Sequence, residues 1–61
     1  MSTYKVYFKN NPTPVVVTDV ITAHVSRYNG HDRDFEAVRF NRERDKDAFF
    51  HALSVAAVVE E

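Results

Sequence analysis

Three histidines and two nearby aspartates are the residues of this 61-residue chain that could bind a metal ion. Asp32 and Asp34 follow His31 at one and three residues, so two histidines and a carboxylate could supply the three protein ligands of a catalytic zinc site. No two histidines have the short spacing that would place both imidazoles on one face of a helix or strand. The spacing favours ordinary histidines, with His24 and His51 on polar strand faces and His31 in a loop. We therefore predict no metal site and no cofactor.

Serine and carboxylate side chains are the remaining candidates for chemistry. Ser26 or Ser54 would need a histidine as general base, an acid to orient it and a concave pocket. The aspartates after His31, like Glu60 and Glu61, stand in solvated stretches, whereas acid–base catalysis needs two carboxyl groups in different environments. A small barrel is filled by its own side chains and has little room for a pocket. We predict no catalytic residue, no small-molecule substrate and no enzymatic activity.

A basic and aromatic strand face is a candidate for binding nucleic acid. Lys5, Tyr7 and Lys9 alternate along the first predicted strand, so two cations flank a ring that could stack on a base while the lysines meet phosphates. Arg39, outward on a neighbouring strand, would extend this face. Acidic residues interleaved with the arginines of the second half, and a net charge of -1, count against it. We keep nucleic-acid binding as the alternative hypothesis.

The supply of aromatic residues points to a protein interface. Three tyrosines and five phenylalanines are more rings than a core of this size needs. Phe35 and one of Phe49 or Phe50 lack an inward position in the predicted strands. Together with Arg39 and neighbouring acids, they have the composition of an interface centre with a polar rim. The competing interpretation is that they form a second small core beneath a charged loop. We predict a non-enzymatic interaction module that binds another protein and pairs with itself through Phe35, Phe49, Phe50 and Arg39.

Length and composition set the frame for these hypotheses. A chain of 61 residues makes one domain, which buries only about 60% of its unfolded surface and is marginally stable. Without cysteine it has no disulfide, which fits a reducing cytoplasm and gives weight to self-association. No apolar run approaches the roughly 20 residues of a membrane-spanning helix, and no signal peptide is recognisable. We expect a soluble cytoplasmic protein with no membrane partner.

The first half of the chain predicts a hairpin and a valine-rich strand. Thr3–Lys9 alternates with the period of a half-buried strand, and the turn formers of Asn10–Pro14 lead back into valines. Val20–Tyr28 fits a strand better than a helix because its residues rank low in helix propensity. Asp19 marks the expected bulge or bend. The valines and isoleucine of Pro14–Tyr28 form the apolar ridge on which the predicted core depends.

The second half predicts a further three strands. Phe35–Phe40 follows a solvated loop and places Val38 and Phe40 inward. After a charged loop, residues 48–51 form a strand, 52–54 a single tight turn, and 55–60 a closing strand rich in β-branched residues. The alternative is a C-terminal helix with an aspartate cap and an apolar stripe.

Five short strands predict an all-β fold, as a small five-stranded SH3-like barrel or a strongly bent antiparallel sheet. The alternative is an α+β fold with a three-stranded sheet and one or two helices at 19–29 and 46–57. The closing stretch Phe-Phe-His-Ala-Leu-Ser-Val-Ala-Ala-Val-Val resembles the last strand pair of small SH3-like barrels. This resemblance implies an architecture and carries no functional residue across.

Overall fold

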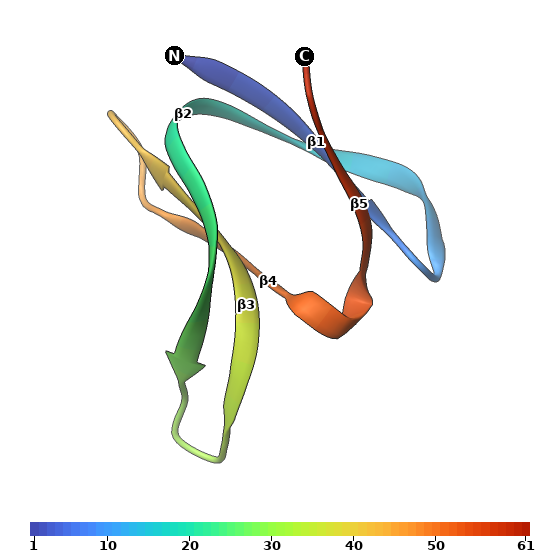
Figure 1. Cartoon of the computed structure of the whole chain (residues 1–61), viewed down its shortest axis with the longest axis vertical. Coiled ribbons are helices and arrows are strands. Elements are labelled where there is room, and N and C mark those ends of the chain that lie inside the picture. Colours follow the sequence, from blue (N-terminus) through green and yellow to red (C-terminus); the bar gives the residue numbers. More distant parts are fainter.

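A computed structural model describes residues 1–61 as one five-stranded antiparallel sheet (Figure 1). The strands lie in the order β4-β3-β2-β1-β5. Their bounds are β1 Ser2–Phe8, β2 Asn11–Asn29, β3 Asp34–Arg42, β4 Ala48–His51 and β5 Val55–Glu60, with a 3₁₀ turn, η1, at Ala52–Ser54. The predicted all-β fold is confirmed. The sheet is not closed into a barrel, so of the two predicted forms the bent antiparallel sheet is the one observed.

Both helical alternatives are wrong. Residues 19–29 belong to β2, and the 46–57 segment contains β4, η1 and the start of β5. The β-branched residues of both segments favour extended backbone, and their caps cannot outweigh that preference. The structure has no helix with the length and hydropathy needed to span a membrane.

The long strand β2 joins the two halves of the sheet. Its first part pairs with β1, where Val17 lies opposite Tyr4, and its second part pairs with β3 as far as Asn29 opposite Asp34. The bend falls at Asp19, which has a positive φ of 63°, and a register shift against β3 follows between Val20 and Thr22. Asp19 is therefore the bend that the sequence predicted. Figure 1 shows β2 curving from one half of the sheet to the other.

The core lies on the inner side of this bend. It is made by Val6, Val17, Val20 and Phe40, all at most 3% exposed. Packed around it are the partly buried side chains of Tyr4, Phe8, Val38, Ala48, Phe50 and Val55. The predicted inward positions of Val38 and Phe40 on β3 are thus confirmed.

The valine ridge contributes less to the core than predicted. Of its six apolar residues only Val17 and Val20 are buried, whereas Val15, Val16, Ile21 and Val25 are 42–61% exposed. Consecutive strand residues point to opposite faces, so a run of valines cannot all face one core. The bend at Asp19 changes the phase of the strand, and this change lets Val17 and Val20, three residues apart, both point inward.

Candidate protein-binding surface

The outer face of β2, β3 and β4, opposite the core, carries a group of rings. Alternation along β3 puts Phe35, Ala37 and Arg39 on this face because Val38 and Phe40 face the core. The strand register then supplies their neighbours: Tyr28 lies opposite Phe35, His51 opposite Ala37, and Phe49 opposite Arg39. Tyr28, Phe35, Phe49 and His51 form what we call the outer aromatic cluster.

The four rings of the outer aromatic cluster contact one another in a chain. The Phe35 ring stacks on the His51 imidazole with centroids 4.5 Å apart and planes 3° from parallel. On its other side Phe35 stacks with Tyr28 at 5.0 Å, and Tyr28 meets Phe49 edge-on at 5.2 Å. Both stacked and edge-on geometries are favourable for aromatic pairs. The rings therefore hold one another in place on the surface.

The cluster also covers small residues of the sheet. Ala37 is fully buried although it points away from the core. Beside it on β2, the Ser26 hydroxyl is buried and has no hydrogen-bond partner. Tyr28 and Phe49 nevertheless remain 38% exposed. The rings thus make a second small core and an exposed aromatic surface at the same time.

His51 is oriented by the turn that follows it. The backbone N–H of Leu53 donates to His51 Nδ1 at 3.3 Å, so the imidazole caps η1. In neutral His51 the ring proton is then on Nε2. The imidazole thus contacts both the backbone of η1 and the ring of Phe35.

Arg39 forms one rim of the cluster. Its guanidinium lies 4.8 Å from the centroid of the Phe49 ring, a cation–π contact. Arg39 Nη2 also donates to Asp47 Oδ2 at 2.8 Å, and the Asn41 amide donates to the same oxygen at 2.9 Å. These hydrogen bonds, Arg39 foremost, hold the pKa of Asp47 below its ordinary value, although partial burial opposes them.

The opposite side of the cluster opens into a shallow pocket of about 350 Å³. It is lined by Arg27, Arg33, Asp34, Phe35, Glu36, His51 and Leu53. Phe35 and His51 thus belong to both the cluster and the pocket, and Leu53 is 75% exposed at its edge. The pocket has apolar groups and charges of both signs, a combination suited to an amphipathic side chain.

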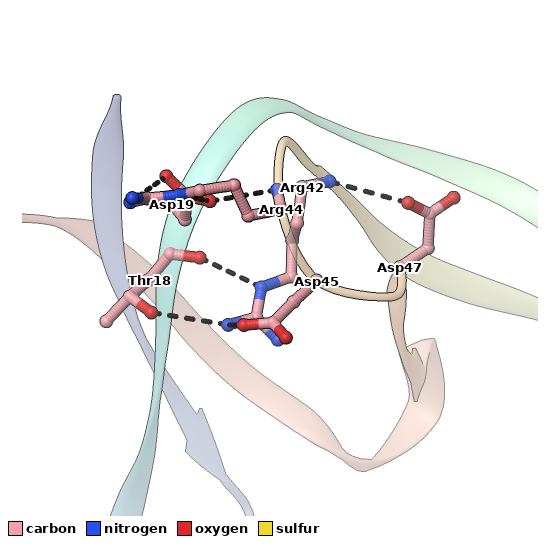
Figure 2. A network of polar contacts seen from close by, with 6 residues as sticks. All are labelled: Thr18, Asp19, Arg42, Arg44, Asp45 and Asp47. Atoms are coloured by element: carbon pink, nitrogen blue, oxygen red, sulfur yellow. Dashed lines mark hydrogen bonds and ion pairs between the residues drawn. The ribbon is translucent and has the colours of Figure 1, made fainter.

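A polar network ties the 43–47 loop to the bend of β2, as Figure 2 shows. The Asp19 carboxylate is only 8% exposed, and Arg44 donates to it from its backbone N–H, Nε and Nη2 at 3.0–3.1 Å. Arg42 Nε donates to the Thr18 carbonyl oxygen at 2.9 Å, and its backbone N–H donates to Asp47 Oδ1 at 3.4 Å. The hydrogen bond from Arg44 lowers the pKa of Asp19. The network holds the loop, and with it Asp47, in place.

Phe50 does not lie where a surface role requires. It faces inward and contacts Phe8 at 5.5 Å and Phe40 at 5.9 Å. Of the four residues predicted for the interface, Phe35, Phe49 and Arg39 meet on the outer face and Phe50 belongs to the inner packing. Which of Phe49 and Phe50 faces inward depends on how β4 is aligned with β3. The loop of residues 43–47 separates the two strands, so the sequence alone does not give this alignment.

Tyr28 and His51 complete the cluster and were not among the predicted interface residues. Tyr28 could have been found from the hairpin, because a turn near Gly30 brings the residues on either side of it opposite each other. Phe49 and His51 are two residues apart on one strand, so they point to the same face. This spacing could have predicted His51 beside Phe49.

The residues proposed for nucleic-acid binding fall on two separate parts of the sheet. Lys5 and Tyr7 share the outer face of β1, where Lys5 Nζ lies 3.0 Å from Glu61 Oε2. Lys9 follows just beyond the end of β1. Arg39 lies on β3, which β2 separates from β1. The structure therefore does not join Arg39 to the two lysines.

The residues weighed for chemistry are dispersed. His24 is exposed on β2, His31 lies in the loop after it and His51 is in the outer aromatic cluster. No three side chains of histidine, cysteine, aspartate or glutamate are grouped so that they could hold a metal ion. Ser54 is exposed in η1.

Relatives add no independent guide to this surface. No protein-family model, curated protein or solved structure matches the chain, so its function has to be inferred from the geometry of the outer face.

Proposed function

We propose that this protein is a non-enzymatic interaction module that binds another protein through the outer aromatic cluster and also associates with itself. One observation carries the proposal. Three aromatic rings and an imidazole pack against one another on the face away from the core, and Tyr28 and Phe49 keep more than a third of their surface exposed.

The cluster has the properties of an energetic centre in a protein interface. Tyrosine and arginine are enriched among the residues that dominate binding energies, and such residues lie in the middle of a polar rim. Here the rings hold one another by stacking, and Arg39 is held by Asp47. Side chains that are ordered before binding lose less conformational entropy when a partner arrives.

The pocket beside Phe35 and His51 indicates the chemistry of the partner. Its apolar groups suit the ring or aliphatic chain of one inserted residue, and Arg27, Arg33, Asp34 and Glu36 surround them with both charges. We expect a protein loop or peptide with an apolar anchor flanked by charged residues.

Pull-down from the native host followed by mass spectrometry, with matched variants as bait, tests the proposal. Phe49→Ala removes an exposed ring of the cluster, and Tyr7→Ala removes a ring of nearly equal exposure, 36% against 38%, from the β1 face. A partner captured by the native protein should bind Phe49→Ala at least tenfold more weakly and Tyr7→Ala unchanged. Equal binding to all three baits would contradict the proposal.

Nucleic-acid binding stays a prediction that no contact in the structure favours. Lys5 and Arg39 are each engaged by a carboxylate. A titration of single-stranded DNA at low salt, with the native protein and with Lys5→Glu combined with Tyr7→Ala, tests it directly. Salt-sensitive binding that this double variant abolishes would establish the alternative.

A further inference from the structure

The last strand, β5, has one open edge. It pairs with β1 and ends the strand order. The backbone N–H of Glu61 donates to the Thr3 carbonyl oxygen at 2.9 Å. This hydrogen bond shows which residues of β5 direct their backbone groups toward β1. Backbone groups alternate in direction along an antiparallel strand, so the N–H and C=O groups of Val58 and Glu60 point away from β1. These groups are available to a further strand.

This edge has few of the features that usually prevent strands from pairing. Natural edge strands are protected by lysine, proline, shortness or inward charges. β5 reads Val55-Ala56-Ala57-Val58-Val59 before its first charge, Glu60, and Val58 and Val59 are 37% and 47% exposed. By contrast, β4 at the other end of the sheet has only four residues. The second part of β2, which pairs with β3 but not with β1, carries a bulge, His24 and Arg27.

We propose that β5 of two copies pair antiparallel about a two-fold axis at Val58, joining two sheets into one of ten strands. This inference rests on the self-association in the proposed function and assigns it to a surface separate from the outer aromatic cluster. In this register Val58 lies opposite Val58 of the second copy, so outward backbone groups meet outward backbone groups. Main-chain hydrogen bonds of this kind are the source of affinity when a strand is added to a sheet edge.

A second copy of this chain fits the edge because the edge is self-complementary. The antiparallel register places the two Glu60 residues four positions apart, about 14 Å along the strands. This exceeds the Debye length of about 10 Å at 0.1 M salt, so their repulsion is screened. Val59 and Ala57 of one copy lie beside those of the other, on the outer face. A two-fold contact also closes on itself and gives a dimer rather than a fibre.

The small core gives such pairing a role in stability. Only five side chains of the monomer are buried. Domains of this size commonly gain stability by oligomerising when they have no disulfide or metal. The β5 pair would cover apolar side chains that the monomer leaves in water.

Sedimentation equilibrium up to about 1 mM, together with amide hydrogen exchange by NMR, tests the proposal. The molar mass should rise to that of a dimer and no further. The Val58 and Glu60 amides should exchange at least tenfold more slowly at high than at low concentration, whereas Val59, whose N–H is bonded to β1 in both states, should change little.

A matched pair of variants locates the interface. Val59 and Val16 flank Lys5 on the same face, at 47% and 52% exposure, but only Val59 lies on β5. Val59→Lys should weaken the dimer at least tenfold, and Val16→Lys should leave it unchanged. Val58→Pro removes an outward N–H without breaking the β1 ladder and should give a monomer, with circular dichroism checking that the sheet persists.

Several outcomes would overturn the proposal. They are a monomer at 1 mM, a dimer in which the Val58 and Glu60 amides stay unprotected, a mass that grows beyond the dimer, and a dimer that Phe35→Ser dissociates but Val59→Lys does not. The last result would assign self-association to the outer aromatic cluster. Partner binding by that cluster is tested separately by Phe49→Ala, so the two proposals can fail independently.

Discussion

Two groups of aromatic side chains lie on opposite faces of the same sheet. The inner group is Tyr4, Phe8, Phe40 and Phe50, and the outer group is the outer aromatic cluster. Ring centroids are 5.4–5.9 Å apart in the inner group and 4.5–5.2 Å apart in the outer group. The inner rings pack around buried valines, whereas the outer rings pack mainly on one another. Adjacent residues of one type, Phe49 and Phe50, thus have different roles because they point to different faces.

The largest expected effect is the loss of a ring from the inner group. Phe40 is fully buried and contacts Tyr4 and Phe50. Phe40→Ala should cost about 3–5 kcal/mol. The whole domain has only about 3–9 kcal/mol at typical values per residue, so the variant should lose about half or more of its free energy of unfolding and melt more than about ten degrees below the native protein. Circular dichroism during heating measures this, and a melting temperature within a few degrees of the native one would show that Phe40 is not central.

A smaller effect is expected for the outer group. Phe49→Ala removes the edge contact with Tyr28 and the cation–π contact with Arg39, together worth about 1–2 kcal/mol. Phe50→Ala should cost roughly twice as much because it opens a cavity in the inner packing. Urea unfolding of both variants compares the two faces directly. Equal losses would remove the distinction between a structural and an exposed group.

Low pH should weaken the ion pair between Arg39 and Asp47 at the rim of the outer aromatic cluster. Arg39 holds the pKa of Asp47 below 3.8, so this carboxylate stabilises the fold above pH 3.8 and loses that contribution as the pH falls through its lowered pKa. Between pH 5 and 8 Asp47 stays ionised, so its contribution to the melting temperature should be constant over that range. Asp47→Asn should lower the melting temperature at pH 7 and reduce its dependence on pH below 4. If the variant and the native protein lose stability in parallel below pH 4, the ion pair does not stabilise the fold.

The smallest expected effect is a gain of stability beneath the outer group. The Ser26 hydroxyl is buried without a hydrogen-bond partner, which is unfavourable. Ser26→Ala removes the hydroxyl and should raise the free energy of unfolding by about 1 kcal/mol, measured by urea unfolding. A loss of stability would mean that an ordered water or an unseen partner satisfies this hydroxyl.

The strands could be predicted from the sequence because their signals are local. The alternation of Thr3–Lys9 and the closing Val55–Glu60 stretch each identify an element within a few residues. The turn predicted over Asn10–Pro14 is shorter in the structure, because β2 begins at Asn11 and includes both prolines. Asp19 was recognisable because one polar residue interrupts a β-branched run.

The two faces could not be fully predicted because they depend on register across loops. A one-residue slip moves every side chain of a strand to the other face, and the loop at 43–47 gives no sign of which phase β4 takes. Phe49 and Phe50 were therefore indistinguishable. Val16 and Val25 are likewise exposed because no other part of the chain covers them. This depends on the tertiary structure and not on the local sequence.

The short loop between β3 and β4 is anchored at both ends. Arg44 attaches it to the bend of β2, and Asp47 attaches it to Arg39 beside the outer aromatic cluster. The loop can move away from the sheet only if both ion pairs break, so either pair alone is enough to hold part of it in place. A substitution at Asp19 alone would therefore release one side of the loop and leave Asp47 paired with Arg39 beside the outer aromatic cluster.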